Sequence, residues 1–309
     1  MSSRTRFKLH SFYLVASLLM VPGMGGLAQT DSSNKEYRLV VDVNLVSILV
    51  TVTRADGSWV ADLTENDFQI FEDGERQKIS FFGRQSDQPL QLCLLFDSSI
   101  SIAPELRTQQ DAAIEFVKAT LGPMDRVSVL RISDDVDEIV HRTNQIDRVI
   151  DSIRSIKPGG GTSLYDAVYL SAGILKEGKG RRVILVISDG TDTTSHTQFQ
   201  ECLKKAQNSE SVVYSLIVQP IKSEPGRNLG GERALIYLSE RTGGRYFRVS
   251  LHENLKDSFE TISRELRTQY ILGYYPQTSS RGNYRKIEVR VTNPTHQVRA
   301  RDGYYRPLR

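Results

Sequence analysis

The first part of the chain, from residue 37 to residue 83, alternates short apolar runs with turn sequences. Valine, leucine and isoleucine recur between residues 40 and 52, and the turn Glu72-Asp73-Gly74 separates the run Phe68–Phe71 from the run Ile79–Phe82. Short runs that are rich in β-branched and aromatic residues and bounded by Asp-Gly turns are typical of strands joined as hairpins. This part of the chain therefore predicts an antiparallel sheet of hairpins.

Between residues 88 and 268 the pattern changes to an alternation of apolar runs and amphipathic segments. The apolar runs are short and continuous, as expected for parallel strands that are buried on both faces. They lie at Leu92–Phe96, Val127–Ile132, Val183–Ile187 and Val212–Val218. Between them, apolar residues recur at intervals of three and four, which is the spacing of one helix face. The alternation predicts a doubly wound α/β fold, similar to a Rossmann fold, with a mainly parallel sheet.

After residue 268 the chain returns to strand patterns, at residues 270–275, 284–291 and 298–301. Three strands are too few to bury an apolar face by themselves, and the N-terminal strands have the same difficulty. We therefore expect one all-β sandwich formed by the N- and C-terminal strands, with the α/β domain inserted into it. The predicted boundaries are 29–87 for the N-terminal sandwich segment, 88–268 for the α/β domain and 269–309 for the C-terminal segment that completes the sandwich.

Oxygen-bearing side chains follow two of the apolar runs. Asp97, Ser99 and Ser101 come directly after the first run, Asp189 closely follows the third, and Thr162 lies in a glycine-rich loop between them. In open α/β sheets, ligands bind outside the carboxyl ends of the strands. Carboxylate and hydroxyl oxygens are hard ligands of the kind that Mg²⁺ or Mn²⁺ prefers. The sequence thus predicts a divalent-cation site at this edge of the sheet.

The three segments resemble the metal-ion-dependent adhesion site (MIDAS) of the von Willebrand factor A-type (VWA) domain family, which is shared with integrin I domains. The family's pattern is Asp-x-Ser-x-Ser, then a threonine in a glycine-rich loop, then an aspartate in a Ser-Asp-Gly turn. The resemblance covers residues 88–268 and implies that the metal ligands are Asp97, Ser99, Ser101, Thr162 and Asp189. Asp, Ser and Thr are also common at helix caps and turns, but caps do not require this order and these intervals.

The resemblance further implies a non-enzymatic binding module. In such a module the bound Mg²⁺ or Mn²⁺ keeps one position open for an Asp or Glu carboxylate of a partner protein. The insertion of the α/β domain into a β-sandwich also resembles integrin I-like domains and exported bacterial proteins with VWA-related domains. On this interpretation the chain is an adhesion or protein-interaction module of the bacterial cell envelope.

The N-terminus has the three parts of an export signal. Basic residues come first, an apolar run extends from Phe12 to Val21, and the small residues Gly26-Leu27-Ala28 follow. The apolar run is too short to span a bilayer comfortably, so we predict a signal peptide at residues 1–28, cleaved after Ala28, and a periplasmic or secreted protein. The alternative is an uncleaved N-terminal anchor. Nothing later in the chain predicts a membrane span.

The net charge of the chain bears on its partners, and its two cysteines bear on a possible disulfide. The whole chain has 40 basic and 37 acidic residues, and the leader holds three of the basic ones, so the remainder is neutral overall. No basic block with interleaved aromatic residues occurs, which argues against nucleic acid as a partner. The two cysteines, Cys93 and Cys202, are expected to be buried free thiols, although an exported protein could join them in a disulfide.

Two other classes of function remain open from the sequence. A metal-dependent hydrolase, such as a phosphatase with Asp97 as nucleophile, lacks support, because Asp97 is followed two positions later by Ser99 rather than by a second carboxylate. A structural or assembly factor could use the metal only to hold the edge of the sheet together. The polar loop Gln219–Gly231 also leaves the carboxyl end of a predicted strand, so we expect it to lie beside the site and to influence the choice of partner.

Overall fold

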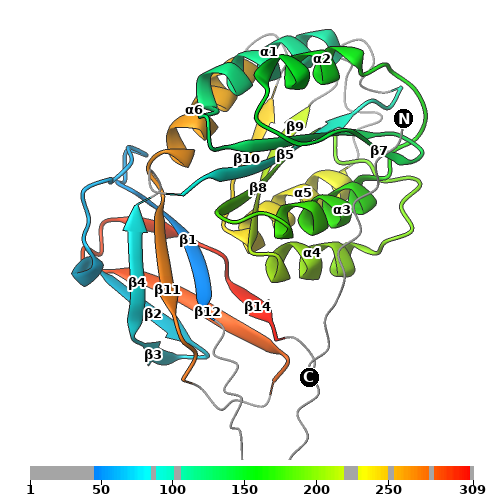
Figure 1. The fold of residues 1–309 in the computed structure, drawn as a ribbon. Coiled ribbons are helices and arrows are strands. Elements are labelled where there is room, and N and C mark those ends of the chain that lie inside the picture. Colours follow the sequence, from blue (N-terminus) through cyan, green and yellow to red (C-terminus); the bar gives the residue numbers. More distant parts are fainter. Residues whose placement is uncertain are drawn as a thin grey trace, which may run out of the picture. The chain divides into compact units, whose positions relative to one another are not determined.

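The computed structural model of this protein describes residues 45–84, 88–100, 106–218, 229–249, 254–277 and 282–306 (Figure 1). The predicted signal peptide and the valine-rich stretch before residue 45 lie outside the described residues, so these predictions stand untested. The predicted boundaries at residues 87 and 268 likewise stay predictions. Among the described residues, no helix is both long enough and apolar enough to cross a membrane.

The central sheet has six strands in the order β10-β9-β8-β5-β6-β7. Its strands are β5 (Leu90–Asp97), β6 (Arg126–Ile132), β7 (Val136–Thr143), β8 (Arg181–Ser188), β9 (Ser211–Val218) and β10 (Tyr246–Val249). All neighbours pair in parallel except β7, which pairs antiparallel with β6. The chain runs from β5 to β6 on one side and later returns to β8 on the other side, so the strand order reverses between β5 and β8.

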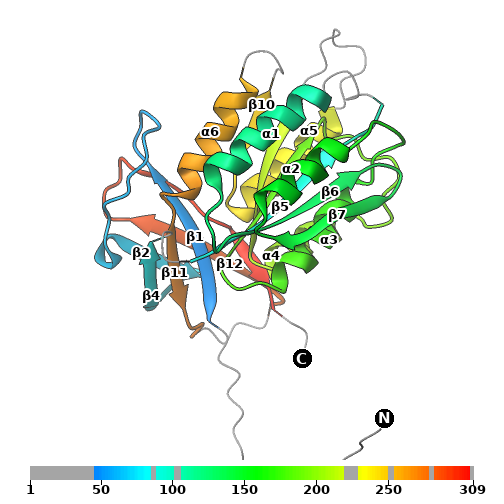
Figure 2. The same cartoon turned by 45° about the horizontal axis from the view of Figure 1, so that its top comes forward.

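Helices cover both faces of this sheet (Figure 1, Figure 2). One layer holds α1 (Leu106–Thr120), α2 (Ile146–Ser155) and α6 (Leu255–Leu266), and the other holds α3 (Leu164–Lys176), α4 (Phe199–Asn208) and α5 (Leu229–Thr242). Alternate residues of β5 enter the two layers: Leu94 and Phe96 pack with the first, and Cys93 and Leu95 with the second. This double burial explains why the strands are continuous apolar runs.

The strands at the two ends of the chain form two antiparallel sheets with a shared core. One sheet has the order β13-β1-β11-β4 and the other has the order β14-β12-β2-β3. The strands are β1 (Val46–Thr53), β2 (Phe68–Glu72), β3 (Glu75–Gln77), β4 (Ile79–Arg84), β11 (Tyr270–Tyr274), β12 (Tyr284–Val291), β13 (Gln297–Arg299) and β14 (Gly303–Tyr305), and a short 3-10 helix, η1 (Glu65–Asp67), precedes β2. The predicted sandwich built from both ends of the chain, with the α/β domain inserted, is confirmed.

The expectation that the N-terminal strands form one sheet of successive hairpins is wrong. Only β2 and β3 pair as a hairpin, while β1 and β4 belong to the other sheet and flank β11 from the C-terminal segment. The reason is that each sheet of a sandwich must cover the other, so a short segment divides its strands between the two layers. The sequence interpretation also missed β14, which has three residues.

Both cysteines are free and buried, as predicted. Cys93 lies on β5 and Cys202 on α4, and neither side chain has any exposed surface. Burial raises the pKa of the Cys93 thiol to about 12, and it raises the pKa of Cys202 further. The two thiols therefore stay protonated and behave as small apolar side chains.

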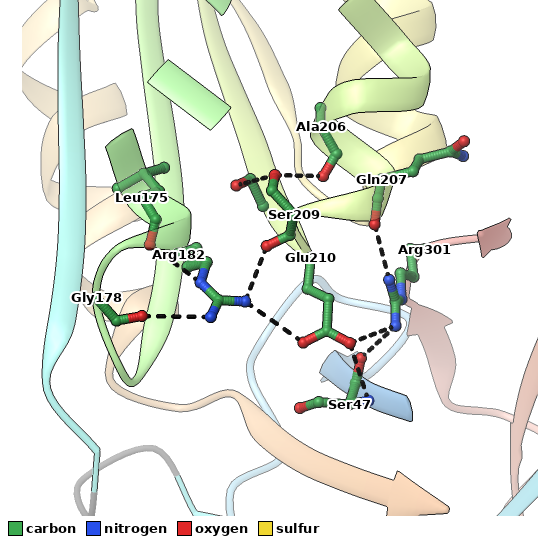
Figure 3. A network of polar contacts seen from close by, with 10 residues as sticks. Ser47, Leu175, Gly178, Arg182, Ala206, Gln207, Ser209, Glu210 and Arg301 are labelled. Carbon is green, nitrogen blue, oxygen red and sulfur yellow. Dashed lines mark hydrogen bonds and ion pairs between the residues drawn. The ribbon is translucent and has the colours of Figure 1, made fainter. Parts of the chain in front are cut away.

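A polar network joins the sandwich to the α/β domain (Figure 3). Glu210, between α4 and β9, accepts hydrogen bonds from Arg301 Nη2 at 3.1 Å and from the backbone N–H of Ser47 at 3.2 Å. Arg301 also donates to the carbonyl oxygens of Ser47, at 2.6 Å, and Gln207, at 3.0 Å. Arg182 pairs with the second Glu210 oxygen at 3.6 Å. Because Ser47 and Arg301 belong to the sandwich, their bonds hold it to the end of α4.

We expect Arg301→Ala to lower the free energy of unfolding by about 2–4 kcal/mol, because it removes the guanidinium donor of the Ser47 and Gln207 carbonyl oxygens and one of the charged partners of Glu210. The Arg301 side chain is only 7% exposed. Arg290→Ala is the matched control, since Arg290 is 57% exposed and pairs with Glu288 on the same strand; it should cost less than about 1 kcal/mol. Urea unfolding measures both changes, and equal effects of the two substitutions would contradict the assigned role of Arg301.

Candidate functional site

Two aspartates meet at the point where the strand order of the central sheet reverses. Asp97 is the last residue of β5, and Asp189 directly follows Ser188, the last residue of the neighbouring strand β8. The two strands are in register up to the pair Phe96 and Ile187, so Asp97 lies beside Ser188 at the carboxyl edge. A reversal of strand order leaves a crevice at this edge, and ligands of open α/β sheets bind there.

Asp97 is fully buried. Its Oδ2 atom accepts a hydrogen bond from the Ser188 hydroxyl at 2.6 Å, and its Oδ1 atom accepts one from the backbone N–H of Ser99 at 2.9 Å. Burial raises the pKa of Asp97 to about 6; the hydrogen bonds from Ser188 and Ser99 lower this pKa, and the charge of Asp189 raises it. Burial and a second carboxylate nearby both oppose ionisation, whereas a cation beside the two carboxylates would favour it.

Of the other predicted ligands, Ser99, Thr162 and Asp189 are described and Ser101 lies outside the described residues. Ser99 is 5% exposed and Thr162 is 2% exposed. Asp189 is half-buried, and its Oδ1 atom accepts a hydrogen bond from the backbone N–H of Thr191 at 2.8 Å. These side chains offer the oxygen atoms that a hard divalent cation uses.

Hydrogen bonds connect the three segments that carry these residues. The Ser188 hydroxyl ties the Asp189 segment to Asp97, and the backbone N–H of Gly159, in the loop before Thr162, donates to the Ser98 carbonyl oxygen at 2.8 Å. Within the described part of the chain, no group of three or more His, Cys, Asp or Glu side chains is placed to hold a metal ion. A cation at this edge would therefore depend on hydroxyl oxygens as well as on the two carboxylates.

The start of α5 packs directly against the Asp189 segment. Gly190 has a positive φ of 87°, and a Cβ atom there would lie 2.6 Å from the carbonyl carbon of Gly231. Only glycine allows the two backbones to approach so closely. The end of the predicted partner loop, residues 229–231, thus borders the site; residues 219–228 lie outside the described residues.

The sequence interpretation did not assign a role in the site to two residues of this region. Ser188 was noted only as part of the Ser-Asp-Gly turn, yet its hydroxyl orients Asp97. Asp134, in the turn after β6, accepts a hydrogen bond from the backbone N–H of Gly161 at 2.7 Å, and a Cβ atom on Gly160 would lie 2.5 Å from its Oδ2 atom. The position of Ser188 at the end of a buried strand could have signalled its role, but no sequence pattern links Asp134 to the glycine loop.

Comparison with known proteins identifies this arrangement. Residues 92–191, which run from β5 through Asp189, match the profile of the von Willebrand factor type A domain. This segment belongs to the VWA family, and we call the α/β domain that contains it the VWA domain. The match agrees with the mainly parallel sheet and its two helix layers. A search of curated proteins found no match to this chain.

Three solved structures are similar to part of this chain, and the first of them shares its fold. Proximal thread matrix protein 1 from the mussel byssus is 13% identical, with a TM-score of 0.51 over 63% of this chain and 51% of that chain. The conserved hypothetical protein BatB from Bacteroides thetaiotaomicron is 22% identical, with a TM-score of 0.47 over 58% and 97%. The vWF domain of the type V pili tip protein Mfa5 from Porphyromonas gingivalis is 11% identical, with a TM-score of 0.48 over 57% of this chain and 94% of that chain.

The packing of Gly190 gives a prediction that a matched glycine can test. Gly190→Ala should lower the free energy of unfolding by more than about 2 kcal/mol, because it adds a backbone clash to the strain of a positive φ. Gly57 has a similar φ of 82° and no atom within 4 Å of a built Cβ, so Gly57→Ala should show the strain alone, about 1–2 kcal/mol. Urea unfolding of both variants measures the difference, and equal losses would show that the contact with Gly231 is not tight.

Proposed function

We propose that this VWA domain binds a divalent cation, Mg²⁺ or Mn²⁺, and uses it to bind a protein partner through a partner's Asp or Glu carboxylate. The observation that carries the proposal is the meeting of Asp97 and Asp189 at the reversal of strand order, with Asp97 fully buried. The proposed ligands are Asp97, Ser99, Ser101, Thr162 and Asp189, of which Ser101 rests on the sequence pattern alone.

The proposed ligands fall into two groups: the carboxylates supply negative charge, and the hydroxyl groups set the geometry of the site. Asp97 and Asp189 supply the negative charge, and the hydroxyl groups of Ser99 and Thr162 are neutral donors that set the spacing of the site. Ser188 and the Ser99 backbone hold the Asp97 carboxylate in one orientation. A bound Mg²⁺ would supply the positive charge that a partner's carboxylate oxygen can approach, which explains how a largely buried acidic edge can bind an acidic group.

The geometry favours binding over hydrolysis. Asp97 has no exposed surface, and each of its carboxylate oxygens accepts a hydrogen bond. A nucleophilic carboxylate must reach its substrate, whereas a ligand of a bound ion needs only to face the ion. The signal peptide predicted at residues 1–28 supports a periplasmic or secreted location for the module.

The first test is a thermal melt in Mg²⁺, in Mn²⁺ and in chelator. If the cation binds only the folded protein, an excess of about 100 times the dissociation constant stabilises it by about 2.7 kcal/mol, which raises the melting temperature by several degrees. Asp97→Ala and Asp189→Ala should lose this shift, and Ser99→Ala should lose only part of it. The fold itself should persist in chelator, because the apolar core of the sheet does not depend on the ion.

Asp151→Ala is the control for these melts, since Asp151 is an exposed aspartate on α2. It should keep the full metal-dependent shift. Equal shifts in wild type and in Asp97→Ala would remove Asp97 from the site and overturn the proposed function.

The second test concerns the partner. Wild type immobilised in Mg²⁺ should retain a protein from a cell-envelope extract and release it in chelator, because the cation bridges the two proteins. Asp97→Ala should not retain it, while Asp151→Ala should. A partner captured equally by all three proteins and unaffected by chelator would show that binding does not pass through the cation.

A further inference from the structure

The first turn of α3 is capped by a segment that is remote in sequence. Ser163 occupies the N-cap position but makes no capping hydrogen bond, because its hydroxyl donates to the Asp134 carbonyl oxygen at 2.6 Å. Instead, the Ser195 hydroxyl accepts hydrogen bonds from the backbone N–H groups of Tyr165 at 3.0 Å and Asp166 at 3.2 Å. The segment after Asp189 thus satisfies backbone donors that a helix start leaves without partners.

The side chain of Asp166, in the first turn of α3, in turn accepts hydrogen bonds from the backbone of the same remote segment. Its Oδ2 atom accepts a hydrogen bond from the backbone N–H of His196 at 2.9 Å, and its Oδ1 atom accepts one from Thr197 at 2.8 Å. Burial acts to raise the pKa of Asp166, but the hydrogen bonds from Thr197 and His196 lower it below its ordinary value. Asp166 therefore stays ionised and holds two consecutive N–H groups, an arrangement that fixes the backbone of the segment.

Further hydrogen bonds reach Thr162 itself. The Thr193 hydroxyl accepts a hydrogen bond from the backbone N–H of Thr162 at 2.9 Å, and the Thr162 carbonyl oxygen accepts hydrogen bonds from the N–H groups of Thr193 at 2.8 Å and Thr194 at 3.3 Å. Residues 162–166 and residues 192–197 are thus joined along their length. Because Asp192 is three residues after Asp189, the two segments fix Thr162 relative to Asp189.

We propose that Asp166 is a positioning residue for the cation site, acting through the clamp formed by residues 162–166 and 192–197. The clamp keeps the Thr162 hydroxyl at the distance from Asp189 that a small cation requires. This inference rests on the proposed function, and it assigns a residue outside the predicted ligand set. Mg²⁺ demands near-ideal octahedral geometry, whereas Ca²⁺ accepts variable distances and coordination numbers. We therefore expect the rigid clamp to favour Mg²⁺ over Ca²⁺.

The test is a calorimetric titration of the full chain with Mg²⁺ and, separately, with Ca²⁺. Asp166→Ala should weaken Mg²⁺ binding about tenfold, as is common for residues that orient metal ligands. Ca²⁺ binding should weaken less, so the ratio of the two affinities falls. Asp166→Asn keeps one acceptor and should give an intermediate result. The exposed Asp151→Ala variant should match wild type. A merely structural role would lower the melting temperature in chelator without changing the ratio of affinities.

A double variant shows whether Asp166 acts through Thr162. In a Thr162→Ala background, Asp166→Ala should leave Mg²⁺ affinity unchanged within about twofold, because the ligand that it positions is already gone. The melting temperature should still fall, since the helix start loses its partners. Independent losses of affinity would overturn the clamp, as would full Mg²⁺ affinity in Asp166→Ala, and the proposed function would survive both results. A wild type that binds neither cation would overturn the proposed function, and the clamp with it.

Discussion

The site depends on the complete burial of strand β5 at the centre of the sheet. Its residues pack into both helix layers, and the strands β6 and β8, which both come later in the chain, pair with its two opposite edges. A buried strand cannot shift its register without moving apolar side chains out of both layers. The last residue of β5, Asp97, is therefore held at a fixed depth at the edge where the strand order reverses.

Placing a carboxylate at that depth is unfavourable unless the structure stabilises it. Ser188 and the backbone of Ser99 each donate one hydrogen bond to Asp97, and the nearby Asp189 acts in the opposite direction. The Asp97 carboxylate is thus held in one orientation by its hydrogen bonds, while the negative charge of Asp189 nearby opposes its ionisation. Such an arrangement is a common feature of functional sites, where local stability is lower because the groups are placed for a ligand. Strand geometry fixes Asp97 and Asp189, while Thr162 is held by the side chains of a neighbouring loop.

The sandwich and the VWA domain are linked by more than the two chain crossings. Arg301 inserts its guanidinium group between backbone carbonyls of β1 and α4, and Glu210 receives donors from both parts (Figure 3). These contacts lie near the beginning of β9, whereas Asp97 and Asp189 lie at the carboxyl edge of the sheet. The polar network and the two aspartates therefore lie at opposite ends of the parallel strands.

The sequence by itself determined the fold class and the candidate site. Short continuous apolar runs between amphipathic segments favour buried parallel strands, and the residues that follow such strands lie at the carboxyl edge of the sheet. This reasoning pointed to Asp97 and Asp189 as candidate ligands. The shortage of strands at each end of the chain also predicted the shared sandwich. Only the tertiary structure decided how β1 to β4 divide between two sheets, because strand pairing depends on partners from the other end of the chain. It alone also assigned roles to Ser188, Asp134 and Asp166, since each contacts a segment at least 27 residues away in the sequence, and no local pattern specifies such a contact.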